Sequence, residues 1–306
     1  MAFLINKINV YFFIYMDLLK KKADTVINDF ISLENKYNDI YLYIFEGGKR
    51  LRQMIVFAIA ESLNTEKNID INVSNLSLGI EMIHNSSLII DDLPCMDNDD
   101  YRRGKLTVHK KYGVPIALQL SIILLRKSFH RIFDTLKQLD KSIEKLYIYN
   151  EIINNNLGKE GLPMGQFLDL NYLKNKIGLT NKKDYQNLIY KKTTTLFNLS
   201  FLLTYVIFET DKDKIDIMSK ASYHFGIAFQ LYDDFTDIIQ DLNSKTPNYV
   251  IKYGCDNTYS VFKENVELCL NHLYSLNIKH QFFIELFDYL NKIIIKEISI
   301  HKSQFP

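Results

Sequence analysis

The chain has 306 residues, a length that allows one large domain or two small ones. Its net charge of +1 gives no bulk affinity for a polyanion, so we do not expect nucleic acid as a partner. Hydrophobic residues make up 47% of the chain, which is ample for a core, and only five prolines and eleven glycines favour long helices. The three cysteines have no paired or metal-type spacing and are expected to be reduced.

The N-terminal segment predicts an irregular lead-in over residues 1–11 and then an amphipathic helix from about Phe12 to Leu33. Its apolar run, MAFLINKINVYFFIYM, is interrupted by polar residues and is too short to cross a bilayer. It also lacks the small-residue cleavage site of a secretory signal. We therefore expect a cytoplasmic protein without a membrane span, and a cleaved organelle address on the first ten residues is the alternative.

The next feature is the basic block GGKRLRQ at residues 47–53. The two glycines are expected to end one helix, and Lys49, Arg50 and Arg52 then lie in the first turn of the next. Basic residues disfavour a helix start, where free N–H groups already concentrate positive charge, unless an anion is bound there. The block therefore predicts an anion site, and a solvated basic turn is the alternative.

A helix is predicted from Asn75 to Ile90, because apolar residues recur there at helical spacing. His84 and Asp91 share one face of this helix. A lone histidine on a helix is usually a buried structural residue, so its place on this face does not by itself predict a ligand. Pro94 ends the helix and predicts a loop that can bring Asp97 back toward Asp91.

Five aspartates fall within ten residues of this loop, and two arginines follow them at once. Crowded carboxylates repel one another unless cations lie among them, and oxygen ligands suit a hard ion such as Mg²⁺. Magnesium takes few carboxylates and completes its shell with water and substrate phosphates. The stretch therefore predicts a magnesium-diphosphate site. The residues concerned are Asp91, Asp92, Asp97, Asp99, Asp100, Arg102 and Arg103.

A second acidic stretch lies at residues 226–239, GIAFQLYDDFTDII, 142 residues beyond the first. Gln230, Asp233, Asp234 and Asp237 recur at i, i+3, i+4 and i+7, which is one face of a helix that is otherwise apolar. Such a stripe is costly to bury unless it is paired or binds metal. The two stretches together predict one cavity with metal on both walls, in an all-α bundle whose site lies in its core.

With these three blocks, the chain resembles the trans-isoprenyl diphosphate synthases, close to the geranylgeranyl and short-chain branch. The resemblance rests on GGKRLRQ, on the aspartate motif at 91–97 with its RRG sequel, and on DDFTD at 233–237. It covers most of the chain, from about residue 47 to about residue 240. It implies an isoprenoid synthase-type helical bundle with a central active-site cavity, a single polyprenyl synthase domain over residues 1–306, and a homodimer.

The resemblance also implies roles for individual residues. It assigns catalysis to Asp91, Asp92, Asp233 and Lys192. Substrate binding is expected of Lys49, Arg52, His84, Arg102, Arg103, Lys192, Thr193 and Gln230. Several Mg²⁺ ions are expected on Asp91, Asp92, Asp97, Asp233, Asp234 and Asp237.

Two further expectations follow from the same resemblance. Asp169 matches a residue that lines the allylic side of the site. The loop that usually follows the second aspartate motif and supplies one more lysine is absent, and Lys245 or, less readily, Lys252 would have to replace that lysine.

The expected reaction is the Mg²⁺-assisted condensation of isopentenyl diphosphate with an allylic diphosphate, with geranylgeranyl diphosphate as the product. Ser86 and Ser87, just before Asp91, leave room for a long chain, whereas farnesyl-making relatives often have an aromatic residue there. The alternatives are a farnesyl diphosphate synthase and a non-catalytic subunit of a heteromeric prenyl synthase. A class I terpene cyclase is disfavoured by the three aspartates of the second motif.

Overall fold

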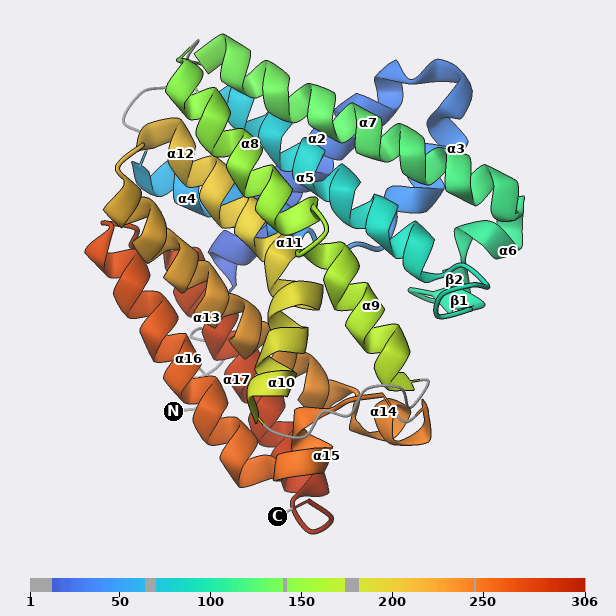
Figure 1. The fold of residues 1–306 in the computed structure, drawn as a ribbon, viewed down its shortest axis with the longest axis vertical. Coiled ribbons are helices and arrows are strands. Elements are labelled where there is room, and N and C mark those ends of the chain that lie inside the picture. Colours follow the sequence, from blue (N-terminus) through green and yellow to red (C-terminus); the bar gives the residue numbers. More distant parts are fainter. Residues whose placement is uncertain (1–12, 64–69, 140–141, 174–181, 245, 306) are drawn as a thin grey trace, which may run out of the picture. The chain divides into compact units, whose positions relative to one another are not determined.

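The computed structural model describes residues 13–63, 70–139, 142–173, 182–244 and 246–305, and these are almost entirely helical (Figure 1). They divide into two compact units. The first unit comprises residues 14–145, and the second comprises Phe13 and residues 146–305. The predicted all-α fold class is confirmed. None of the described helices is long and apolar enough to cross a membrane.

The first unit is built around helix α5, which packs most extensively on α7 and also contacts α4 and α2. Figure 1 shows α5 and α7 lying side by side. Its elements in chain order are α2 (Ile14–Leu33), η1 (Asn35–Tyr37), α3 (Asn38–Phe45), α4 (Leu51–Leu63), α5 (Asp70–Asp91), strands β1 (Tyr101–Arg102) and β2 (Lys105–Leu106), α6 (Val108–Tyr112) and α7 (Val114–Leu139). Helix α8 (Ile143–Leu157) begins at the end of this unit.

The core of the first unit lies between α2, α3, α5 and α7. Phe30, Tyr41, Phe45, Leu78 and Met82 are each at most 3% exposed within one apolar cluster. Burial of side chains of this size contributes about 1.5–3 kcal/mol each, which is why the amphipathic helix predicted near Phe12 to Leu33 forms here as α2.

The second unit contains α9 (Leu162–Leu173), α10 (Lys182–Ile189), the π-helical segment η3 (Tyr190–Thr194), α11 (Thr195–Asn198), a second π-helical segment η4 (Leu199–Leu203) and α12 (Thr204–Phe208). From α10 to α12 the helix is continuous. The remaining helices are α13 (Lys212–Thr236), α14 (Ile238–Ser244), α15 (Tyr249–Tyr253), α16 (Cys255–Ser275) and α17 (Gln281–His301).

An aromatic cluster holds the second unit together. The rings of Phe197 and Phe225 are 4.9 Å apart, those of Phe201 and Phe225 are 5.3 Å apart, and Phe287 lies 5.7 Å from Phe225. These contacts join the α11–η4 segment to α13 and α17, and the Phe197–Phe225 pair is edge-to-face, an arrangement that adds to the apolar burial. Helix α13, which carries the second acidic stretch, is thereby packed on two sides.

Candidate functional site

The first unit gathers basic side chains at the glycine pair. A Cβ added to Gly48 would lie 2.2 Å from Nη1 of Arg50 and 3.2 Å from Nη1 of Arg103, so both guanidiniums pass over this backbone. Gly47 has φ +77°, a left-handed conformation that glycine adopts without strain. The blocks around residues 47–53 and 101–104, separate in sequence, therefore lie together.

Arg50 serves mainly to hold this arrangement in place. It is 6% exposed, its Nε donates to Asp24 at 2.8 Å, and its Nη1 lies 3.4 Å from Glu81. Its charge is therefore balanced within the protein. The predicted helix start is displaced slightly, because α4 begins at Leu51, so that Lys49 and Arg50 precede it and only Arg52 lies in its first turn.

Arg103 has a different environment. The residue as a whole is exposed, but its guanidinium lies over the Gly48 backbone, and among the described residues no hydrogen bond or ion pair holds it. Burial lowers its pKa, Glu81 opposes this, and the charges of Arg50 and Arg102 lower the pKa further. A desolvated cation among other cations is stabilised by an added anion.

His84 lies within the same field of positive charge. Burial lowers its pKa well below 6.5, and Arg52, Arg103, Arg102 and Arg50 act in the same direction. Its Nδ1 is buried and has no hydrogen-bond partner among the described residues. A neutral imidazole beside arginines can hydrogen-bond an anion without adding charge of its own. We call Arg52, His84, Arg102 and Arg103 the basic cluster.

In the first aspartate motif, some carboxylates are accessible to solvent and others are bonded to donors of the protein. Helix α5 ends at Asp91, and the loop after Pro94 turns back so that the Asp97 N–H donates to the Asp91 carbonyl at 2.9 Å. Asp91 is partly exposed and Asp97 is exposed.

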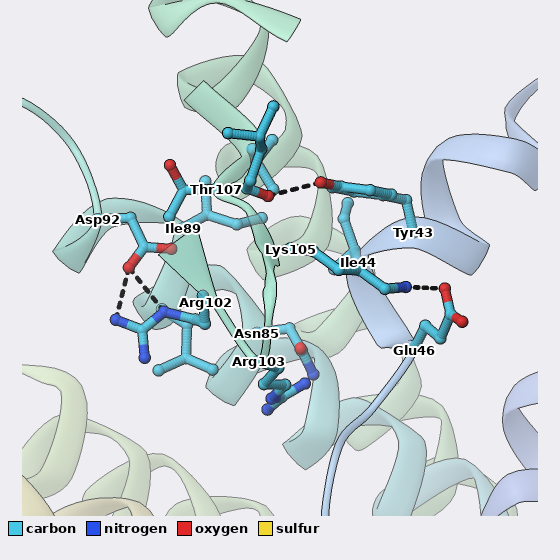
Figure 2. A pocket seen from close by; sticks show the side chains of 13 residues that line it. Tyr43, Ile44, Glu46, Asn85, Ile89, Asp92, Arg102, Arg103, Lys105 and Thr107 are labelled. Carbon is cyan, nitrogen blue, oxygen red and sulfur yellow. Dashed lines mark hydrogen bonds and ion pairs between the residues drawn. The ribbon is translucent and has the colours of Figure 1, made fainter. Parts of the chain in front are cut away.

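Asp92, in contrast, is 3% exposed and accepts from Nε and Nη2 of Arg102 at 2.6 and 2.5 Å (Figure 2). Burial lowers the pKa of Arg102, but the hydrogen bond and charge of Asp92 outweigh it, and Asp99 at 3.6 Å adds to them, so that the pKa is raised. Asp92 and Arg102, predicted to contact metal and diphosphate, contact each other.

The second aspartate motif shows the same division. Asp234 is 4% exposed, and its carboxylate accepts from Gln230 Nε2 at 2.9 Å and from the Tyr249 N–H at 2.8 Å. Burial raises its pKa to about 7, against these hydrogen bonds. Asp233 is partly exposed and Asp237 is exposed. Helix α13 ends at Thr236, so Asp237 occupies the C-cap and does not continue the predicted helical face.

Lys192 and Thr193 lie in the π-helical segment η3, beside these aspartates. Lys192 forms an ion pair with Asp169 of α9, and Thr193 donates to Gln230 at 2.7 Å. Thr193, Gln230, Asp234 and Tyr249 thus form one hydrogen-bonded chain. Gln230, predicted to bind substrate, bridges Thr193 and Asp234. Segments of π-helix are frequent at functional sites.

A cavity of about 120 Å³ in the second unit brings these groups together. The polar side chains that line it include Asp169, Lys192, Thr193, Gln230, Asp237 and Asp241. Asp241 was not identified from the sequence, although it lies four residues after Asp237, as Asp237 lies four after Asp233. Burial raises its pKa, and Asn248 Nδ2 donates to it at 2.9 Å.

The donor set of both motifs fits a hard divalent ion. Among the described residues no three acidic, histidine or cysteine side chains converge closely enough to hold a metal by themselves. Mg²⁺ does not require such a group, because waters and substrate phosphates complete its shell. Asp91 with Asp97, and Asp233 with Asp237, are the accessible carboxylates. Metal binding by the six predicted aspartates stays a prediction.

The lysine predicted to replace the missing loop lysine is not identified. Lys245 lies outside the described residues. The Lys252 Nζ lies 4.9 Å from the ring centre of Tyr185, an attractive cation–π contact.

Comparison with known proteins identifies the family. The family model described as polyprenyl synthetase matches residues 34–248, more than two thirds of the chain. A farnesyl diphosphate synthase of Buchnera aphidicola subsp. Schizaphis graminum is 30% identical over 302 residues, covering 92% of this chain and 96% of that enzyme. The chain belongs to the polyprenyl synthetase family, and the predicted resemblance to the isoprenyl diphosphate synthases is confirmed.

Other relatives carry names for two product lengths. A geranylgeranyl diphosphate synthase of Pantoea ananas is 33% identical over 203 residues, and a farnesyl diphosphate synthase of Bacillus subtilis is 34% identical over 192 residues. Each of these two alignments covers 63% of this chain and 62% of the relative's length.

Solved structures confirm the isoprenoid synthase-type fold. A geranyltransferase from Legionella pneumophila superposes with a TM-score of 0.77 at 20% identity, covering 91% of this chain and 96% of that chain. A geranyltransferase from Helicobacter pylori, complexed with magnesium and isoprenyl diphosphate, gives a TM-score of 0.73 at 23% identity, covering 92% and 98%.

Proposed function

We propose that the chain is a prenyltransferase that condenses isopentenyl diphosphate with an allylic diphosphate to make geranylgeranyl diphosphate. The observation that carries the proposal is the basic cluster, in which no hydrogen bond or ion pair among the described residues holds the Arg103 guanidinium, and the buried Nδ1 of His84 has no hydrogen-bond partner there. A diphosphate would supply an anionic partner for the Arg103 guanidinium. The names of the relatives support the same class of substrate.

Arg52, His84 and Arg103 of the basic cluster would hold isopentenyl diphosphate together with Lys49, with Lys49 entering from the glycine loop, Arg52 from the start of α4 and Arg103 from the β1–β2 hairpin. The allylic diphosphate would be held by Lys192, which Asp169 orients, and by Arg102, which Asp92 orients. Two diphosphates bring roughly six negative charges, so both groups of cations are needed.

Mg²⁺ bound to Asp91, Asp97, Asp233 and Asp237 would neutralise charge on the departing diphosphate. The accessible carboxylates, the chemistry of these oxygen ligands and the magnesium complex of the Helicobacter pylori protein support this assignment. The bond between the allylic carbon and its diphosphate oxygen then breaks, and the double bond of isopentenyl diphosphate attacks the cation. The new carbon–carbon bond forms, and a proton passes to the released diphosphate.

Asp92 and Asp234 have a supporting role in this scheme, because protein donors already occupy both carboxylates. The reaction needs both aspartate motifs to serve one pair of substrates, so the single polyprenyl synthase domain of residues 1–306 is part of the proposal. A homodimer is proposed with it, on the resemblance to the family, and light scattering of the purified chain tests it.

The proposed product length rests on Ser87. Helical geometry places a residue four positions before Asp91 close to its face, and a residue five positions before it about 140° away. Ser87 and His84 are partly exposed on the Asp91 face, whereas Ser86 is 3% exposed and bonds Ser121 of α7 at 3.0 Å. Ser86 therefore packs against α7, and its place along the product path stays a prediction.

The test incubates the purified chain with Mg²⁺, isopentenyl diphosphate and allylic primers of each length, and sizes the products. We expect chains of twenty carbons. Asp91→Ala and Asp233→Ala should each lower turnover by a factor of about 100 or more while the protein stays folded. A product of fifteen carbons would favour the farnesyl diphosphate synthase named among the relatives. Absence of turnover with every primer would overturn the proposal.

A further inference from the structure

The β1–β2 hairpin that carries Arg102 and Arg103 is too small to hold its own shape. Each strand has two residues, paired as Tyr101 with Leu106 and Arg102 with Lys105. Both turn residues are left-handed, Arg103 with φ 54° and Gly104 with φ 75°. This conformation strains a non-glycine residue, and an isolated two-stranded hairpin is marginal in water. Contacts from outside the hairpin must therefore keep it in place.

The end of helix α3 supplies such contacts (Figure 2). The Tyr43 hydroxyl donates to the Leu106 carbonyl at 2.5 Å, and Glu46 forms an ion pair with Lys105. The Lys105 Nζ lies 5.3 Å from the centre of the Tyr43 ring. The Lys111 Nζ, on α6 just beyond the hairpin, lies 3.5 Å from the same ring. Tyr43 and Glu46 thus hold both residues of strand β2.

These contacts also connect the hairpin to the glycine loop. Glu46 is the C-cap of α3 and directly precedes Gly47. A Cβ on Gly47 would lie 3.6 Å from Cδ and 3.7 Å from Cβ of Arg103, so the arginine passes against this loop. The loop leads on to Lys49 and Arg52. One pair of α3 side chains therefore links the two segments that supply the basic cluster.

We propose that Tyr43 and Glu46 are positioning residues that hold the β1–β2 hairpin, and with it the Arg102 and Arg103 guanidiniums, in the orientation that binds diphosphate. The inference rests on the proposed function for the identity of the substrate. It adds two residues that contact neither metal nor substrate in that scheme and act through the hairpin.

Because the Glu46–Lys105 ion pair is exposed, a positioning role can be distinguished from a role in global stability. The Glu46 side chain is 56% exposed and that of Lys105 is 33% exposed, and ion pairs this exposed contribute little to global stability. Changes at Glu46 should therefore alter ligand binding more than the melting temperature.

The test is a charge exchange. Glu46→Lys places two ammonium groups together, and combining it with Lys105→Glu restores the pair with the wild-type net charge. Binding of inorganic diphosphate in metal-free buffer measures the affinity of the basic cluster for an anion without any turnover. We expect Glu46→Lys to weaken this binding about tenfold although it adds positive charge, and the double variant to recover most of the loss.

Kinetics with substrate give an independent measure. Glu46→Lys should raise the KM for isopentenyl diphosphate about tenfold with kcat at saturation changed by no more than about twofold, because binding and not the chemical step is affected. Glu61→Lys is the matched control, since Glu61 pairs with Lys22 at 3.1 Å in the same unit and lies near the end of α4, the end away from the glycine loop. It should leave both measurements at the wild-type level.

Unchanged diphosphate binding in Glu46→Lys, or a double variant no better than the single one, would overturn the inference. If Glu46→Lys does not fold, Tyr43→Phe, which removes only the hydroxyl bonded to Leu106, decides by the same two measurements. Weakened diphosphate binding in a chain that turns over no primer would uphold the positioning role and overturn the proposed function alone.

Discussion

Gly165 lies where α9 passes closest to the π-helical segment η3. A Cβ at this position would lie 2.6 Å from the Lys191 carbonyl carbon and the Lys192 nitrogen, and 2.7 Å from the Lys191 oxygen. All three are backbone atoms of a continuous helix and cannot rotate away. Gly165→Ala therefore forces the two helices apart.

The magnitude follows from two opposing effects. Overpacking costs about 1–3 kcal/mol. Alanine is a better helix former than glycine by about 1 kcal/mol. The backbone contact places the cost at the upper end of the range, so we expect the free energy of unfolding to fall by roughly 1–2 kcal/mol. Asp169 lies one turn beyond Gly165 and holds Lys192, so the separation should also raise the KM for the allylic primer.

Urea unfolding and primer titration measure the two effects. Gly79→Ala is the matched control, because its Cβ would meet the Ile132 side chain at 3.0 Å and the Ser128 carbonyl at 3.1 Å, in helix α5 of the first unit, whereas η3 belongs to the second. It should cost less stability and leave the KM for the primer unchanged. A Gly165→Ala protein as stable as the wild type, with the wild-type KM, would refute the reasoning.

Three further predictions rest on single-residue substitutions. The pKa of His84 in the folded protein lies well below its usual 6.5, so the unfolded chain binds more protons below that pH. The contribution of neutral His84 to the free energy of unfolding is therefore present above about pH 6.5 and is lost below it, at no more than about 1.4 kcal/mol per pH unit. His84→Gln should flatten this acid-side loss in denaturation measured from about pH 8 to pH 5, and an unchanged slope would contradict it. Arg103→Ala should mainly raise the KM for isopentenyl diphosphate and Lys192→Ala that for the allylic primer, whereas equal effects on both substrates would refute the assignment. Ser87→Phe should shift the product from twenty toward fifteen carbons, while Ser86→Phe should lower the melting temperature through its contact with α7; products of unchanged length from Ser87→Phe would exclude the proposed path.

The sequence by itself determined the elements and the chemistry they carry. Apolar spacing predicted α5, and Pro94 predicted that it ends at the first aspartate motif, as it does at Asp91. The shared face of His84 and Asp91 followed from helical period alone. These features depend on residues within a few turns of one another, where backbone geometry leaves little choice.

The tertiary structure decided which of these carboxylates are accessible and which are bonded to donors of the protein. Asp92 and Asp234 are indistinguishable from Asp91 and Asp233 in sequence, yet Arg102 holds one and the Tyr249 N–H holds the other.

The anchoring of the hairpin also depends on contacts that the sequence pattern does not encode. Glu46 meets Lys105 across 59 residues, and Tyr43 meets Leu106 across 63. Contacts of this span depend on how whole helices pack, because loop closure costs nearly the same entropy for many alternative pairings and only packing selects among them.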